Sequence, residues 1–295
     1  MHTLILGCGF SGRSIARALA TDGRVGGTRR EPTALGSLRE RGIEAFALDG
    51  TVSGELRAAL GTVTHLVSSV APGRQPPLDD PMLDLLRPLI EAGGLPALAW
   101  IGYLSTIGVY GDHGGGWVDE DTPCTSAQPR SIARVEAERA WSALGERAGV
   151  PVALFRLSGI YGPGRNAVRD ALAGRARVLI KPGQVFNRIH VDDLASAVAL
   201  AARRNAGGVF NVTDDLPAPS QDVVRHAHDL VGRSAPPAVA FEDAELSPMA
   251  LSFYAESKRV SNARSKKVLG LQYRYPDYRV GLAALLGREL EDGGD

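Results

Sequence analysis

The chain has 295 residues, 44% of them hydrophobic, and its 33 basic residues balance 33 acidic ones, so the formal net charge is zero. This length is enough for one large domain and a smaller lobe with a sizeable buried core. Balanced charge gives no bulk attraction for a nucleic acid or an anionic membrane, so we expect a small-molecule partner. The apolar runs fall short of a membrane span or a signal peptide, and two cysteines are too few for a disulfide framework or a metal site. We therefore expect a cytoplasmic protein that holds no metal.

Short apolar segments of β type alternate with helical stretches along the chain. Strands are predicted at residues 3–6, 24–28, 44–48, 63–68, 97–105, 152–157 and 209–212. This alternation predicts an α/β fold, a doubly wound parallel sheet of the Rossmann type with helices on both faces. We expect residues 1–160 to form the dinucleotide-binding domain, with a returning strand near residues 209–212, and residues 161–295 to form mainly a smaller substrate-binding lobe.

A glycine-rich turn separates the first predicted strand from a helical stretch. It reads Gly7-Cys8-Gly9-Phe10-Ser11-Gly12. In a dinucleotide-binding turn, Gly7 makes the tight turn, Gly9 lets the backbone approach the pyrophosphate, and Gly12 lets the helix pack closely on the strand. The phosphates would lie on the free N–H groups of the helix, with Phe10 and Ser11 beside them. The alternative is a tight turn without a ligand.

The end of the second predicted strand indicates which dinucleotide is bound. It reads Thr28-Arg29-Arg30, without the acid that would bind a ribose 2′-hydroxyl. A guanidinium suits a 2′-phosphate, so NADP(H) is favoured over NAD(H), unless the two arginines are an ordinary solvated pair. The remaining cofactor contacts are expected at the ends of other predicted strands, from Asp49, Ser68 and Leu157.

Four further segments carry a resemblance to a known family. They are YLSTIGVYG at 103–111, RLSGIYGPG at 156–164, HVDDLA at 190–195 and VFNV at 209–212. In order and spacing they resemble the extended short-chain dehydrogenase/reductases, the group of NAD-dependent sugar-nucleotide epimerases and dehydratases. The resemblance implies the Rossmann fold, a nicotinamide cofactor, and a site at the carboxyl edge of the sheet beside the C-terminal lobe.

The expected catalytic helix departs from that family. The family carries Tyr-x-x-x-Lys there, with the Tyr moving a proton and the Lys holding the nicotinamide ribose, but the matching positions are Arg130 and Arg134. Arginine stays protonated, so Arg130 cannot act as an acid or base, whereas Arg134 can still bind ribose hydroxyls. The family's Ser/Thr position falls on Thr106, whose hydroxyl can bond a substrate carbonyl. The pattern is similar to the atypical, YeeZ-like branch of the family.

The two arginines allow two interpretations. Facing the nicotinamide, they would suit an anionic substrate, with Arg188 and His190 as further substrate contacts. Alternatively, Arg130, Arg134 and Glu138 form a solvated ion-pair stripe, and His190 is a structural histidine. Glu120 and Asp121 are interpreted as a solvated loop. Among Tyr110, Tyr161 and His190 as replacement proton donors we favour Tyr161, which follows the sixth predicted strand; its alternative role is an aromatic wall against the cofactor.

Two functions remain open on the sequence. The first is an NADP(H)-dependent oxidoreductase or epimerase acting on a small polar, possibly anionic substrate with a non-standard proton donor. The second is a catalytically silent NADP(H)-binding sensor or partner-binding protein. Family members often pair through two helices, which correspond to residues 81–92 and 131–144. The second carries a seam of Ala133, Ala137, Ala140 and Leu144, so a homodimer is expected.

Overall fold

The computed structural model describes residues 1–73 and 79–292. Seven parallel strands form the central sheet, in the order β11-β7-β5-β4-β1-β2-β3. They are β1 (His2–Leu6), β2 (Arg24–Arg29), β3 (Glu44–Ala47), β4 (His65–Ser68), β5 (Trp100–Thr106), β7 (Val152–Leu157) and β11 (Gly208–Val212). All seven predicted strands are present and parallel, which confirms the doubly wound fold.

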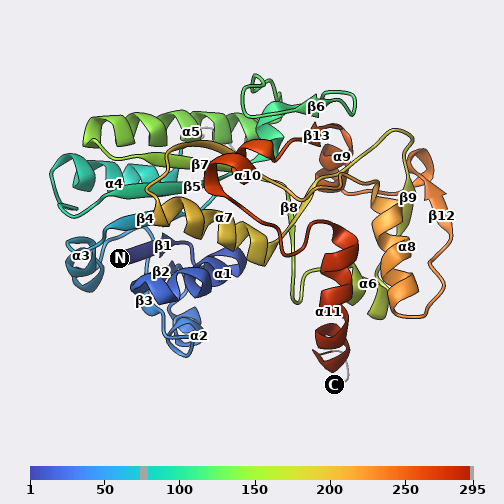
Figure 1. Ribbon diagram of the computed structural model, residues 1–295, viewed down its shortest axis with the longest axis horizontal. Helices are drawn as coiled ribbons and strands as arrows, with labels where there is room; N and C mark the ends of the chain where they lie inside the picture. The colour runs from blue at the N-terminus through green and yellow to red at the C-terminus, as the bar shows by residue number, and fades with distance from the viewer. Residues whose placement is uncertain (74–78, 293–295) are drawn as a thin grey trace.

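Helices cover both faces of this sheet (Figure 1). On one face, α1 (Phe10–Leu19) packs along α7 (Val191–Arg203), and on the other α4 (Pro81–Glu91) packs along α5 (Pro129–Ala148). The second half of the chain thus contributes to this domain the returning strand β11 and two helices that lie against the sheet, α7 and α10 (Ala263–Leu269). Shorter elements complete this part: α2 (Gly36–Arg39), α3 (Gly54–Leu60) and the 3₁₀ turns Ala20–Asp22, Pro32–Ala34 and Ile107–Tyr110. The division near residue 160 stays a prediction.

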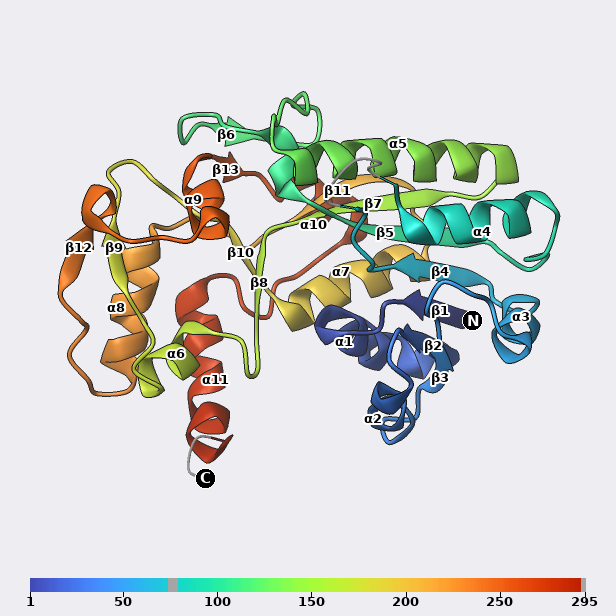
Figure 2. The ribbon, with the colours of Figure 1, turned by 180° about the vertical axis from the view of Figure 1, so that it is seen from behind.

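The C-terminal lobe lies beyond the carboxyl ends of the strands, as both views show (Figure 2). Helices α6 (Ala167–Leu172), α8 (Ser220–Leu230) and α11 (Tyr278–Asp292) share one apolar cluster. Three parallel strand pairs lie outside the central sheet: β8 (Gly159–Tyr161) with β10 (Arg188–His190), β9 (Val178–Ile180) with β12 (Ala238–Ala240), and β6 (Trp117–Val118) with β13 (Arg259–Val260). The 3₁₀ turn Phe241–Asp243 and helix α9 (Pro248–Tyr254) complete it. Among the described helices, none is both long and apolar enough to cross a membrane.

Helix α5 is fastened to the sheet by a buried ion pair. The Glu138 carboxylate accepts hydrogen bonds from Arg156 Nη2 on β7 at 2.8 Å and from Ser105 Oγ on β5 at 2.5 Å. Both charged side chains are less than a tenth exposed. The solvated stripe of Arg130, Arg134 and Glu138 is therefore wrong, because Glu138 faces the sheet and has its partner there.

The small-residue seam of α5 is also buried within the chain. Ala133, Ala137 and Leu144 are at most 4% exposed, and Ala137 and Leu144 belong to the core between α5, α4 and the sheet. Since these side chains pack on the chain's own strands, they cannot line a close contact with a second copy. The homodimer stays a prediction, but this seam no longer supports it.

Candidate functional site

The glycine turn has the backbone that its sequence predicts. Gly7 adopts a φ of +76°, where a side chain would be strained, and a Cβ there would lie 2.7 Å from Val70. A Cβ at Gly12 would lie 3.2 Å from the Gly7 carbonyl oxygen and 3.3 Å from Ile5 on β1, so α1 packs tightly on its strand. At Gly9, by contrast, a Cβ would meet nothing nearer than Arg29 Nη1 at 3.6 Å. The space above the middle glycine is therefore open.

This open space suits a dinucleotide. Helix α1 begins after Gly9 without a side-chain cap and without an acidic residue in its first turn. Its first N–H groups, which belong to Phe10, Ser11 and Gly12, point toward the turn, and the positive end of the helix favours a phosphate there. The backbone and the space of the turn thus fit the pyrophosphate of a nicotinamide dinucleotide.

The end of β2 meets the turn directly. Thr28 Oγ1 accepts a hydrogen bond from Gly7 N at 3.0 Å, so this side chain holds the turn in place. Arg29 Nη1 donates to the Cys8 carbonyl oxygen at 3.3 Å, which places the guanidinium beside Gly9. Arg30 is exposed in the bend that follows. Of the two arginines, Arg29 is the one that borders the turn.

The other residues expected to bind the cofactor lie at the ends of strands. Ser68 ends β4, is fully buried, and its hydroxyl has no hydrogen-bond partner among the described residues. Leu157 ends β7 and lines the cleft described below. Asp49 is exposed after β3, where Thr51 Oγ1 donates to its carboxylate at 2.9 Å and holds its pKa below the usual value.

A cleft of about 730 Å³ lies between the carboxyl edge of the sheet and the C-terminal lobe. Thr106 and Leu157 line it from the strand ends, α5 supplies Arg130, Ser131 and Arg134, and the lobe supplies Arg188 and residues of α9. Thr106 Oγ1 accepts a hydrogen bond from Gly108 N at 3.1 Å, which leaves the hydroxyl proton free to be donated. The structure thus brings together five expected site residues that come from separate segments of the sequence: Thr106, Arg130, Arg134, Tyr161 and Arg188.

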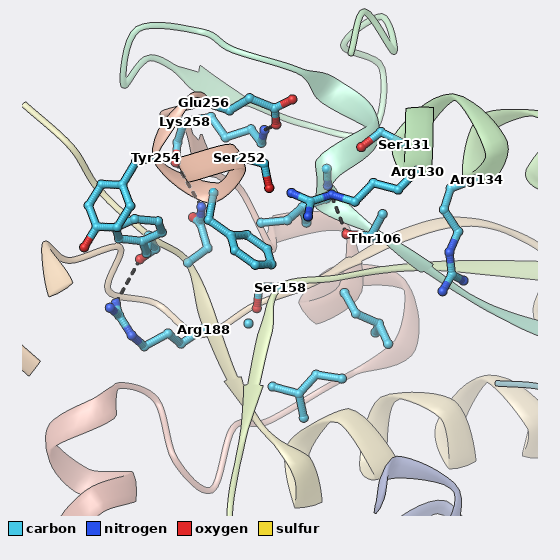
Figure 3. A pocket seen from close by; sticks show the side chains of 18 of the residues that line it. Thr106, Arg130, Ser131, Arg134, Ser158, Arg188, Ser252, Tyr254, Glu256 and Lys258 are labelled. Carbon is cyan, nitrogen blue, oxygen red and sulfur yellow. Dashed lines mark hydrogen bonds and ion pairs between the residues drawn. The ribbon is translucent and has the colours of Figure 1, made fainter. Parts of the chain in front are cut away.

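The two arginines of α5 point in different directions (Figure 3). Arg134 Nη1 donates to the Leu104 carbonyl oxygen and to the Tyr103 hydroxyl, so it lies along β5. Arg130 reaches instead to α9, where its guanidinium lies 4.4 Å from the centre of the Phe253 ring and Nη1 lies 3.4 Å from the Met249 sulfur. The two arginines are one helical turn apart, and Arg134 lies against the sheet while Arg130 contacts the lobe.

Tyr161 faces the lobe with its hydroxyl. This oxygen is 3.5 Å from the Asp277 carbonyl oxygen, and a Cβ at Gly281 of α11 would lie 1.9 Å from it. Burial raises the pKa of Tyr161. Tyr110 is engaged as well, because its hydroxyl donates to Asn211 Oδ1 at 2.7 Å and accepts from Arg156, and burial raises its pKa to about 12. Both hydroxyl groups are therefore engaged by other parts of the protein, and neither is placed as a proton donor to a ligand in the cleft.

Arg188 contributes a positive charge to the lobe side of the cleft. Its Nη1 donates to the carbonyl oxygens of Phe186 and Ala218, at 3.1 and 3.0 Å, rather than to a carboxylate. Burial lowers its pKa, although an arginine keeps its proton at neutral pH. The neighbouring Asp214 is 1% exposed, and burial raises the pKa of its carboxyl to about 8. Burial therefore favours the neutral form of Asp214, so this carboxyl offsets the charge of Arg188 less than an ordinary aspartate would.

His190 has a structural place. Its Nδ1 accepts a hydrogen bond from Asp192 N at 3.1 Å and so caps α7, and its ring packs 3.9 Å from that of Tyr275. The side chain is 1% exposed, and burial lowers its pKa to about 4. These contacts match the structural alternative, and His190 is not among the residues that line the cleft.

Several site residues were not found from the sequence. Glu120 was interpreted as a solvated loop residue, but it is 8% exposed and accepts a hydrogen bond from Asn211 N at 2.8 Å. Met249, Phe253 and Lys258 line the cleft although no motif marks them. The one available signal is Pro248, a common first residue of a helix, followed by a run of apolar residues.

Comparisons with known proteins agree with this geometry. The sequence pattern of the NAD dependent epimerase/dehydratase family matches residues 3–213. The chain belongs to this family, which places it among oxidoreductase-like enzymes.

Among individual proteins, the chain is 32% identical over 184 residues to a 3-diazoavenalumate denitrifying reductase of Streptomyces sp., a match that covers 59% of this chain and 56% of that protein. It is 27% identical over 281 residues to the YeeZ protein of Escherichia coli K12, covering 92% and 96% of the two chains. A functionally unknown conserved protein from Silicibacter pomeroyi has a solved structure with a TM-score of 0.87 and 45% identity, covering 97% of this chain and 98% of that one. The resemblance to the YeeZ-like branch is thereby confirmed.

Replacing the middle glycine tests the turn as the cofactor site. Gly9→Val should abolish dinucleotide binding without unfolding the chain, because the protein leaves the Cβ position open while the added methyl groups enter the pyrophosphate space. Calorimetric titration with NADPH measures the affinity, and thermal unfolding checks the fold. Gly54→Val, also at an open position but far along the chain on α3, is the control and should keep the parental affinity. Parental affinity of the Gly9 variant would remove the turn from the site.

The raised pKa of Asp214 predicts a pH-dependent stability. Between the ordinary value of 3.8 and about 8, the folded chain keeps this proton while the unfolded chain loses it, so Asp214 lowers stability as pH rises. Asp214→Asn removes this effect, and the variant should gain stability relative to the parent from pH 5 to pH 8, by at most about 1.4 kcal/mol per pH unit. Urea unfolding at four pH values measures the difference. The exposed Asp229→Asn is the control and should show a flat difference; a flat difference for Asp214→Asn would contradict its buried protonated state.

Proposed function

We propose that this protein is an NADP(H)-dependent oxidoreductase that moves a hydride between the nicotinamide and a small anionic substrate held in the cleft. The observation that carries the proposal is the cleft at the carboxyl edge of the sheet. It contains two arginines, Arg130 and Arg188, for which the described residues supply no carboxylate partner. The relative named as a reductase supports this reaction class. When bound, the nicotinamide supplies or accepts the hydride at its C4 position.

The residues on the cofactor side have three roles. They hold the pyrophosphate, bind the 2′-phosphate, or bind the nicotinamide ribose. Gly7, Gly9 and Gly12 shape the turn, and Phe10 and Ser11 present backbone N–H groups to the pyrophosphate. Arg29 borders Gly9 and is the residue for a 2′-phosphate, which favours NADP(H) over NAD(H). Arg134 donates through Nη1 to residues of β5, and its remaining N–H groups are available for the hydroxyls of the nicotinamide ribose.

A reduction suits this cleft better than an epimerisation. Epimerisation through a hydride needs a base that takes a proton from a substrate hydroxyl, and Arg130 at the family's tyrosine position cannot accept one. A reduction needs a proton donor, and the Thr106 hydroxyl can orient the acceptor atom while solvent supplies the proton. Tyr161 fits the role of an aromatic wall rather than that of the donor, given the place of its hydroxyl against α11.

Two alanine variants test the cofactor assignment. Arg29→Ala should lose about 1.5–3 kcal/mol of binding to NADPH and keep its affinity for NADH, because only NADPH carries the 2′-phosphate. Arg134→Ala should weaken both cofactors alike, because both carry the same nicotinamide ribose. Arg39→Ala, an exposed arginine on α2, is the control. Equal affinity of the parent for NADPH and NADH would contradict the preference, and unchanged binding by the Arg134 variant would leave that residue without a ribose role.

A catalytically silent NADP(H)-binding protein is the alternative; it would bind the cofactor in the same way but consume no NADPH with any ligand of the cleft. The expected homodimer would form through the outer faces of α4 and α5. The protein would act in the cytoplasm, as expected from the sequence.

A further inference from the structure

The polar side chains of the cleft largely have hydrogen-bond partners within the protein. Asn187 donates through Nδ2 to the Lys258 carbonyl oxygen and accepts from Val260 N, both at 2.9 Å. Lys258 Nζ pairs with Glu256 at 2.8 Å, and Ser220 Oγ lies 2.9 Å from the Tyr254 hydroxyl. A ligand rich in hydroxyl groups would have to break these bonds or leave its own groups unpaired, and either is costly.

The lobe side of the cleft is aromatic instead. Phe253 is 54% exposed, and its ring has Arg130 over one face. Phe186 and Tyr254 meet edge to face, with ring centres 5.1 Å apart. Aliphatic side chains of Ile107 and Val185 continue the lining. Rings and arginine planes of this kind favour a flat ligand with π electrons over a puckered one.

Positive charge lies on both sides of this aromatic surface. In Figure 3, Arg130 and Arg188 stand on opposite sides of Ser158, with Tyr254 on the side of Arg188. The guanidinium of Arg130 is stacked on Phe253, whereas Arg188 donates through Nη1 to carbonyl oxygens and has no carboxylate partner within residues 1–73 and 79–292. A partly buried cation of this kind is stabilised when an anionic group joins it.

We infer that the substrate of this cleft is a planar conjugated carboxylate, an aryl or arylalkenyl acid, rather than a sugar nucleotide. The carboxylate pairs with Arg188, and the flat part lies against Phe253, whose other face is covered by Arg130. Phe253 is then the residue that selects for planarity. This inference rests on the proposed function, because the same cleft would hold the hydride acceptor.

Four probes separate the features of such a ligand. Cinnamate is planar and anionic, 3-cyclohexylpropanoate has the same length and charge without planarity, cinnamyl alcohol is planar without charge, and UDP-glucose is a sugar nucleotide. Each is titrated calorimetrically into the full chain, alone and saturated with NADP⁺. Cinnamate should bind about threefold to tenfold more tightly than 3-cyclohexylpropanoate, in line with the strength of an aromatic pair, and more tightly than the other two probes.

Variants assign the selectivity to residues. Phe253→Leu should remove the preference for cinnamate over 3-cyclohexylpropanoate while both still bind. Arg188→Gln should weaken both acids and leave cinnamyl alcohol unchanged. Trp117→Leu, which removes an exposed aromatic side chain outside the cleft, is the control and should bind all probes like the parent.

The outcomes distinguish this inference from the proposed function. Tighter binding of UDP-glucose, equal binding of the two acids, or no binding of cinnamate overturns the planar carboxylate, even where NADP⁺ binds well. Failure of NADP⁺ to bind overturns the proposed function, and the titrations without cofactor then still decide the ligand class. Selectivity that survives in Phe253→Leu overturns the role of Phe253.

Discussion

The buried pair of Glu138 and Arg156 fixes the position of the helix on which the site depends. Breaking such a pair typically costs about 3–5 kcal/mol, because it leaves one charge buried without its partner. Ser105 and Tyr110 complete the hydrogen bonds of the pair, so that α5, β5 and β7 meet at one polar point inside an apolar core. Arg130 and Arg134 project from the same helix, and their places at the cleft follow from this attachment.

Fixing α5 gives its two arginines separate surroundings. Arg134 lies one turn closer to the buried pair and is bonded to β5, whereas Arg130 lies at the helix start and stacks on Phe253 of the lobe. In the short-chain dehydrogenase/reductase pattern, the tyrosine at the position of Arg130 moves a proton, and the lysine at the position of Arg134 holds the nicotinamide ribose. Two permanent cations cannot share that task, so in the proposed reaction these arginines would position charge and would not move a proton.

A buried carboxyl lies beside the positive charge on the lobe side of the cleft. Asp214 follows β11 and is buried beside Arg188, and its N–H donates to the Arg188 carbonyl oxygen at 2.7 Å. Because burial raises the pKa of this carboxyl, Asp214 offsets the positive charge of Arg188 less than an ordinary aspartate would. An anionic ligand therefore gains more from this surface than it would beside an ionised aspartate.

The sequence by itself determined the features that depend on neighbouring residues. The seven strands follow from local apolar runs, and the turn follows from Gly7, Gly9 and Gly12, since backbone freedom is a property of the residue itself. The matching of Arg130 and Arg134 to the family's catalytic positions also needed only spacing along one helix.

Tertiary structure decided every contact between residues far apart in the chain. One of the two interpretations of this helix placed Glu138 in solvent beside Arg134, but Arg156 of another strand binds it in the core. The Tyr161 hydroxyl lies against Gly281, and Phe253 reaches the cleft because α9 of the lobe meets Arg130 at the start of α5. Periodicity shows which residues share a face of an element but not what covers that face, and burial, pKa and pairing all depend on the covering partner.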